Sequence, residues 1–183
     1  MIYVFLANGF EEIEALAPVD LLRRAGHEVR TVAVGCGDDT KVAGAHGIEV
    51  IANLRESDFC DVMPTVVILP GGMPVTTNLE ESITVWSAAN NCVAHGGLLC
   101  AICAAPSVIG KAGLLDGKRA TCFPGFEEYL IGATVVDKKA GVDGNVITAK
   151  GMGCANEFAL AIIEHLDGKE KADEIAASIF FNL

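Results

Sequence analysis

The chain has 183 residues, of which 51% are hydrophobic and 20% are charged, and 24 acidic against 13 basic side chains give a net charge of −11. This length suffices for one domain with a well-formed core, so we expect a single domain over residues 1–183. The negative charge repels phosphate groups and anionic lipids, which argues against nucleic acids and membranes as partners.

The N-terminal segment and the cysteines indicate a cytoplasmic protein. The first six residues lack a basic region and run directly into Asn8 and Gly9, as expected for a first strand and not for a signal peptide. The seven cysteines are an odd number, so we expect no disulfide framework and predict that most of the thiols are small buried hydrophobic groups.

Strand-like runs alternate with helical patterns along the chain. In order, we expect a strand at 2–7, a helix at 11–25, a strand at 28–34, a hairpin at 42–53, a strand at 65–69 before the turn at 71–72, a helix at 82–94, a strand at 97–102, a helix at 104–111, a strand at 120–123, a hairpin around 143–144 and helices at about 154–167 and 169–181. Pro18 should kink or restart the first helix. This pattern predicts an α/β sandwich around a mostly parallel sheet.

Cys103 falls where a buried strand passes directly into a helix. Small residues follow it in the segment Ala101-Ile102-Cys103-Ala104-Ala105-Pro106, so the chain can turn sharply and hold the cysteine in a strained conformation. The first N–H groups of the helix would then lower the pKa of the thiol and favour a nucleophilic thiolate. The alternative is an ordinary core cysteine.

Cys100 and Cys103 also form a Cys-x-x-Cys pattern, which is typical of dithiol redox sites. Because Cys100 lies within the predicted strand, three residues at ~3.3 Å each separate the α-carbons by about 10 Å. A disulfide requires them within about 7 Å, which argues against a dithiol switch.

Three glutamates crowd the start of the first predicted helix. For Glu11 and Glu12, a favourable interaction with the helix dipole is a sufficient role. Glu14 instead shares a helical stripe with the apolar residues Phe10, Ala17 and Leu21. A carboxyl group in apolar surroundings should have a raised pKa.

Five segments, in order along nearly the whole chain, resemble the ThiJ/PfpI superfamily in its DJ-one branch. They are Asn8-Gly9-Phe10-Glu11-Glu12-Ile13-Glu14, Arg23-Arg24-Ala25-Gly26, Leu69-Pro70-Gly71-Gly72, Ala101-Ile102-Cys103-Ala104-Ala105-Pro106 and Glu157-Phe158-Ala159-Leu160-Ala161-Ile162. The resemblance implies a flavodoxin-like three-layer sandwich, similar to class I glutamine amidotransferases, that forms a homodimer.

The resemblance also implies the roles of five residues. Cys103 would be the nucleophile and Glu14 its hydrogen-bonding acid/base. The backbone N–H groups of Gly72 and Ala104 would form an oxyanion site, and Gly71 would keep that turn open.

Two departures from the superfamily concern histidine. Protease-like members carry a histidine directly after the nucleophile, where this chain has Ala104. The protein that gives the DJ-one branch its name has a histidine near the site, where this chain has Phe123. Proteolysis is therefore not expected. The four histidines show no metal-ligand spacing with each other or with a cysteine, and we propose no metal and no cofactor.

The sequence thus leads to two principal functional hypotheses. In the first, the chain is a cofactor-free glyoxalase or deglycase that acts on methylglyoxal-type oxoaldehydes or on their adducts with proteins. In the second, Cys103 is an oxidative-stress sensor or the switch of a redox-regulated chaperone, through oxidation to a sulfinate without turnover. A constitutive chaperone has no sequence signal of its own, and no phosphate-binding glycine loop supports a biosynthetic role in thiazole metabolism.

Overall fold

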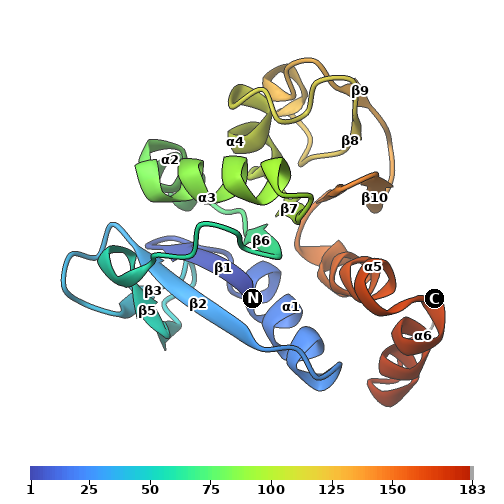
Figure 1. Cartoon of the computed structure of the whole chain (residues 1–183), viewed down its shortest axis with the longest axis horizontal. Coiled ribbons are helices and arrows are strands. Elements are labelled where there is room, and N and C mark those ends of the chain that lie inside the picture. The colour runs from blue at the N-terminus through green and yellow to red at the C-terminus, as the bar shows by residue number, and fades with distance from the viewer. Residues whose placement is uncertain (182–183) are drawn as a thin grey trace.

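The computed structural model describes residues 1–181, and a seven-stranded sheet of order β10-β11-β7-β6-β1-β2-β5 lies at its centre (Figure 1). All neighbouring strands are parallel except β10, which pairs with β11 in the antiparallel sense. The predicted flavodoxin-like α/β sandwich is therefore confirmed. The strands of this sheet are β1 (Ile2–Ala7), β2 (Val29–Val34), β5 (Leu54–Arg55), β6 (Val66–Leu69), β7 (Leu98–Ile102), β10 (Ala140–Asp143) and β11 (Val146–Ala149).

Helices cover both faces of the sheet, with α1, α5 and α6 on one side and α2, α3 and α4 on the other (Figure 1). Their bounds are α1 (Glu12–Arg24), α2 (Val75–Glu81), α3 (Ile83–Ala94), α4 (Pro106–Lys111), α5 (Ala155–Asp167) and α6 (Lys169–Ser178). Among residues 1–181, no helix has the length and the apolar character that crossing a bilayer requires.

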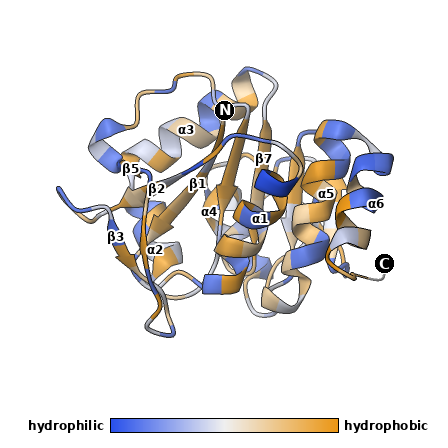
Figure 2. Ribbon diagram, turned by 90° about the horizontal axis from the view of Figure 1, so that it is seen from below, coloured by the Kyte–Doolittle hydropathy of each residue, from blue (hydrophilic) through white to orange (hydrophobic). Residues whose placement is uncertain are grey.

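The central strands form the core because their side chains are apolar on both faces. Every residue of β1 and β7 is buried, and both strands stand out as hydrophobic between the two helical layers (Figure 2). A parallel sheet that is covered on both sides needs such continuous apolar strands. The strand ends, and the loops that follow them, are thereby held on a rigid base.

Helix α1 runs without interruption through Pro18, so the predicted restart is wrong. Proline removes one intrahelical hydrogen bond and clashes with the preceding turn. Here the helix is retained because its inner face, including Ala15, Val19 and Leu22, is buried against the rest of the protein. Tertiary packing supplies most of the stability of helices in proteins and outweighs this local cost.

Three further boundaries differ from the sequence-based expectation. Helix α2 was not predicted, because Val75 and Thr76 are poor helix formers, and burial of its inner face holds it in place. The strand expected at 120–123 is limited to β8 (Arg119–Ala120), which pairs only with the two-residue strand β9 (Thr134–Val135) in a separate small sheet. Helix α4 begins at Pro106 and not at residue 104.

A hairpin of β3 (Lys41–Ala43) and β4 (Glu49–Ile51) is fastened to the start of α1 by Glu12. The Glu12 carboxylate accepts the backbone N–H of His46 at 2.7 Å, and its second oxygen lies 2.7 Å from His46 Nδ1. Burial alone would raise the pKa of Glu12, but the bonds from His46 lower it to about 2. Glu12 therefore does more than interact with the helix dipole, the role expected from the sequence.

We expect Glu12→Gln to lower the free energy of unfolding by roughly 1–3 kcal/mol, because the amide cannot satisfy both His46 donors as a carboxylate does. The Glu12 pKa is depressed, so its contribution is present above the ordinary value of 4.5 and is lost as the pH falls toward about 2. The His46 pKa is raised, so its contribution is complete below 6.5 and is lost at higher pH. The ion pair is thus strongest between pH 4.5 and 6.5.

Urea unfolding at about pH 5.5 and at about pH 3 measures this dependence. Glu28→Gln is the matched control, because the exposed Glu28 carboxylate forms a surface ion pair with the exposed Arg30. Equal destabilisation by the two substitutions at the higher pH would show that the hairpin is not held by Glu12.

Candidate active site

Three neighbouring strands bring the candidate residues together. Strand β6 lies between β1 and β7, and all three are parallel, so their carboxyl ends meet at one edge of the sheet. Glu14 follows β1, Gly71 and Gly72 follow β6, and Cys103 follows β7. Strand β1 connects to β2 through α1 on one side of the sheet, and β6 connects to β7 through α2 and α3 on the other. The edge between β1 and β6 is therefore the topological switch point, where α/β proteins bind ligands.

Cys103 occupies the predicted sharp bend, with a left-handed backbone conformation of φ 65°. Such a conformation costs roughly 1–3 kcal/mol for a residue other than glycine and persists only where the surroundings enforce it. Here the N–H of Cys103 donates to the Ala149 carbonyl at 2.9 Å, and its own carbonyl accepts the N–H of Phe123 at 2.7 Å. These two backbone bonds hold the bend and thereby fix the direction in which the Cα–Cβ bond of Cys103 points.

Glu14 projects from α1 into this site and is only 1% exposed. One carboxyl oxygen accepts the backbone N–H of Gly71 at 3.0 Å, and the carboxyl group also hydrogen-bonds the Cys103 thiol. Burial, and to a smaller extent the charge of Glu11, raises the pKa of Glu14 to about 7, although the bonds from Cys103, Gly71 and Met152 oppose that rise. The carboxyl group can therefore both hold and release a proton near neutral pH.

The pKa of the Cys103 thiol is raised to about 12, first by burial and then by the charge and hydrogen bond of Glu14. The N–H groups of Ala104 and Gly72 bond the sulfur and lower the pKa, but they do not outweigh these effects. The expected lowering by the first N–H group after the bend is present, but the net fall in this pKa that it was expected to cause is wrong. Helix α4 is short and begins three residues beyond Cys103, whereas a buried carboxylate lies directly beside the sulfur.

Cys103 and Glu14 consequently behave as one proton-sharing pair. When the Glu14 carboxylate is ionised, the thiol keeps its proton, and the thiolate forms when that proton passes to Glu14. In that second form a neutral carboxylic acid and the two amides of Gly72 and Ala104 surround the sulfur. The structure thus places a thiol, a carboxyl group and two N–H donors together, an arrangement with the chemistry that nucleophilic attack and proton transfer require.

Gly71 leaves the space in which the pair meets. A β-carbon at this position would lie 2.6 Å from Cys103 Cβ and 2.8 Å from Glu14 Oε2, and both distances are too short for non-bonded atoms. Any other residue would therefore force the two functional groups apart. All five residues that the sequence singled out lie together, and their catalytic roles remain predictions.

A fourth strand end completes the site and was not found from the sequence. Strand β11 lies beside β7, and its last residue, Ala149, provides the carbonyl that anchors Cys103. The segment that follows β11 provides the Met152 amide that bonds Glu14. The sequence feature that could have indicated this fourth strand end is an apolar strand followed by two nearby glycines, Gly151 and Gly153. A similar feature precedes and includes Gly71 and Gly72. This pattern becomes informative only when the strand order is known.

The other cysteines are free thiols outside this arrangement. Cys100 is fully buried in β7, and burial raises its pKa well above the ordinary value. The Cys-x-x-Cys pattern therefore consists of one core thiol and one thiol at the bend.

One group of side chains has a geometry that could hold a metal ion. Donor atoms of Glu11, Glu12 and His46 lie within 4.8 Å of one another. Both Glu12 oxygens already accept bonds from His46, so the structure accounts for this cluster as the hairpin anchor. The sequence did not reveal it, because the hairpin brings His46 to α1 across 34 residues.

The titration of the pair predicts how fast Cys103 reacts with alkylating reagents. We expect the rate to rise as the pH passes about 7, where the pair loses its first proton and the form with a thiolate becomes accessible. In Glu14→Gln the inflection at about 7 should disappear, leaving one inflection at higher pH that belongs to the thiol alone.

Alkylation by iodoacetamide across this pH range, followed at Cys103 by peptide mass spectrometry, measures both profiles. The exposed Cys60 in the same samples is the internal control for the reagent. Identical Cys103 profiles in the two proteins would show that sulfur and carboxyl do not share a proton.

Comparison with known proteins places this geometry in a family. The model of the DJ-1/PfpI family matches residues 1–165. Protein dj-1beta of Drosophila melanogaster is 37% identical over 178 residues, which cover 96% of this chain and 94% of that protein. The glutathione-independent glyoxalase DJR-1.2 of Caenorhabditis elegans is 33% identical, covering 90% of this chain and 87% of that protein. The chain spans less than half of two Arabidopsis thaliana relatives, the DJ-1 homologs A and B (44% and 40%).

Solved structures agree with this assignment. A mutant of a DJ-1 superfamily protein from Salmonella typhimurium superimposes with a TM-score of 0.93 at 33% identity, covering 100% of this chain and 98% of that one. The homodimer, the aldehyde or glycated-protein partners and the cytoplasmic location expected from the sequence stay predictions. The fold and the extent of the match show that the chain belongs to the DJ-1/PfpI family.

Proposed function

We propose that this chain is a cofactor-free, glutathione-independent glyoxalase that converts 2-oxoaldehydes such as methylglyoxal, free or as adducts on proteins, into 2-hydroxy acids. The observation that carries the proposal is the Cys103 thiol hydrogen-bonded to Glu14, a carboxyl group that is 1% exposed and has a pKa of about 7. The similarity to the glutathione-independent glyoxalase DJR-1.2 of Caenorhabditis elegans supports it.

The first step is attack of the sulfur on the aldehyde carbon. With the proton on Glu14, the Cys103 thiolate forms a carbon–sulfur bond, and the carbonyl electron pair moves to the oxygen. The N–H groups of Gly72 and Ala104, which lie beside the sulfur, stabilise the developing oxyanion. Glu14 then gives its proton to that oxygen, which leaves a hemithioacetal and a carboxylate.

The second step moves hydrogen between the two carbons. The Glu14 carboxylate removes the proton from the sulfur-bearing carbon and returns it to the neighbouring carbon, while the hydroxyl proton passes to the neighbouring oxygen. The result is a thioester in which the first carbon is oxidised by two electrons and the second is reduced by two. Water hydrolyses the thioester, releasing the 2-hydroxy acid and restoring the Cys103 thiol, so no external oxidant or reductant is consumed.

Purified protein incubated with methylglyoxal and without glutathione should therefore produce lactate. We expect Cys103→Ser to abolish measurable turnover, and Glu14→Gln to reduce it by about 10²–10⁴-fold, the range for loss of a general acid/base. Enzymatic determination of lactate in time courses measures both effects.

Cys60→Ser is the matched control, because Cys60 is an exposed free thiol away from the pair, and it should retain full activity. Lactate formation that persists in Cys103→Ser or Glu14→Gln would overturn the mechanism. Absence of turnover in the unmodified chain would overturn the proposed activity.

A second candidate function is oxidation sensing, and the hydrogen-bond donors around the sulfur favour it. A sulfinate at Cys103 could accept bonds from the Gly72 and Ala104 amides, which already contact the sulfur, and from protonated Glu14. Peroxide supplies the oxygen atoms, and each oxidation step releases water. The stabilised product would make Cys103 oxidise in preference to other thiols.

We expect mild peroxide to convert Cys103 to the sulfinate before it oxidises the exposed Cys60 or the partly buried Cys36. Peptide mass spectrometry of the three sites measures the order, and Glu14→Gln should reduce the yield of sulfinate at Cys103. Equal oxidation of the three thiols would contradict this function.

A further inference from the structure

Phe123 places an aromatic ring at the edge of the Cys103–Glu14 pair. Its ring carbons Cδ2 and Cε2 lie 3.3 Å and 3.8 Å from the position that a β-carbon on Gly151 would occupy. Glu14 Oε1 lies 4.0 Å from the same position. The ring and the carboxyl group therefore both border Gly151, where the absence of a side chain leaves them room.

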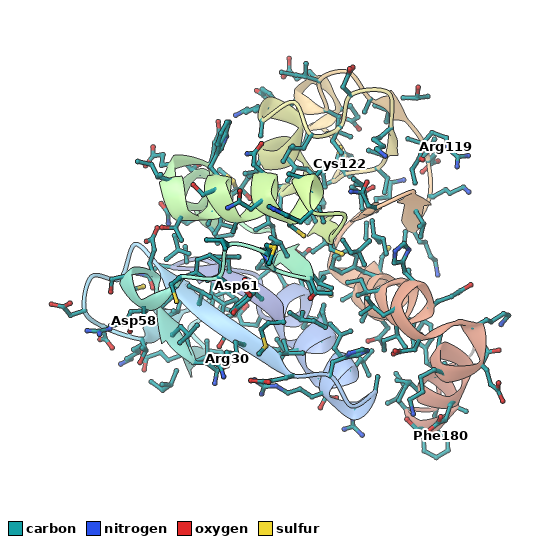
Figure 3. All side chains as sticks on the ribbon, viewed as in Figure 1. Arg30, Asp58, Asp61, Arg119, Cys122 and Phe180 are labelled. Carbon is teal, nitrogen blue, oxygen red and sulfur yellow. The ribbon has the colours of Figure 1, made fainter. Side chains whose placement is uncertain are left out.

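The backbone fixes Phe123 relative to the nucleophile. Its N–H donates to the Cys103 carbonyl at 2.7 Å, and its own carbonyl accepts the N–H of Phe126 at 3.1 Å. The segment leaves β8 through the buried Cys122, which is labelled in Figure 3. These backbone bonds fix the Cα of Phe123, from which the ring projects, relative to Cys103.

The ring is 48% exposed, although it stands beside a buried pair. Scattered exposed apolar side chains are common and need no function. Phe123 differs because one side of its ring borders the site and much of the remainder is free to contact a molecule bound at Cys103. Two further apolar side chains next to the site are exposed: Met73 follows Gly72 in the sequence, and Met152 follows Gly151.

The charges that act directly on Glu14 and Cys103 are acidic. By contrast, Lys150, which precedes Gly151 and acts on Cys122, is paired with Asp137. Glu11 acts on Glu14 strongly enough to raise its pKa further, and Glu14 is itself ionised above about pH 7. A substrate with a carboxylate or phosphate substituent would be repelled by these groups. The site therefore favours an uncharged substituent that can lie against the ring.

We propose that Phe123 determines substrate preference: its ring is an apolar wall that selects uncharged 2-oxoaldehydes with an aryl substituent, or an alkyl substituent larger than methyl. This inference rests on the proposed glyoxalase activity and narrows its substrate class. The reaction is unchanged, so phenylglyoxal and water would give mandelate, and glyoxal and water would give glycolate. The two substrates also differ in intrinsic reactivity, but this difference is the same for every variant and cancels when the ratios of variant and unmodified chain are compared.

The test compares kcat/KM for phenylglyoxal with kcat/KM for glyoxal in each variant, with the acids separated by chromatography. In Phe123→Ala and Phe123→His we expect this ratio to fall about tenfold, the lower end of the range for lost apolar contacts in a binding site. Phe123→Leu keeps an apolar side chain and should keep the ratio within about twofold. Trp86→Ala, which removes an exposed aromatic ring from α3, is the matched control and should leave the ratio unchanged.

A second measurement does not require turnover. The rate of Cys103 labelling by N-phenylmaleimide relative to N-methylmaleimide, determined by mass spectrometry, should fall several-fold in Phe123→Ala and remain in Phe123→Leu. A labelling preference without oxoaldehyde turnover would support the role of Phe123 in selecting apolar substituents and would refute the glyoxalase activity. Turnover with unchanged ratios in Phe123→Ala and Phe123→His would refute the role of Phe123 and leave the glyoxalase activity standing.

Sedimentation of the same variants tests whether a second copy of the chain covers the ring. A shift to smaller particles in Phe123→Ala, with unchanged substrate and labelling ratios, would assign the ring to an interface and overturn the proposal. Unchanged sedimentation with the expected fall in both ratios would support it.

Discussion

The hydrogen bond between the Cys103 thiol and the Glu14 carboxyl is the interaction on which the rest of the site depends. Burial disfavours a charge on either group, and the close approach disfavours charges on both, so the pair keeps one proton from about pH 7 to about 12. Sulfur is nucleophilic only when that proton lies on oxygen. Reactivity is therefore governed by the position of one proton and not by a thiol that is permanently ionised.

The fold makes this arrangement possible by fixing each partner on a different element. Three parallel strands end at one edge, a glycine between them leaves room for contact, and two backbone bonds hold the nucleophile in its strained conformation. Strain of this kind is tolerated because the strands beneath it are completely buried. A small movement of any of these elements would separate sulfur from carboxyl.

The strands and the bend were predictable because local sequence determines them. The short uninterrupted apolar runs of β1 and β7 favour central strands, and the small residues after Cys103 allow a tight turn. The burial of Glu14 also followed from its apolar helical stripe. These features depend on neighbours within one or two turns of the chain.

The features that were missed depend on contacts across long stretches of sequence. The pairing of Glu12 with His46 requires the hairpin to fold back over 34 residues, and the Met152 amide reaches Glu14 only because β11 lies beside β7. The direction of the Cys103 pKa shift was wrong for the same reason. A helix start is visible in the sequence, whereas a carboxylate brought to the sulfur from another element is not.

The three glutamates at the start of α1 show how strongly position controls the chemistry of one residue type. Glu11 caps the helix by accepting the Glu14 N–H at 2.7 Å, Glu12 remains ionised with a pKa of about 2, and Glu14 has a pKa of about 7. The ionised Glu12 ties the hairpin to the same helical turn that carries Glu14. Proton transfer demands a positional precision of about half an ångström from the groups involved. The charged anchor and the cap therefore fix the helical turn from which the Glu14 carboxyl reaches the sulfur.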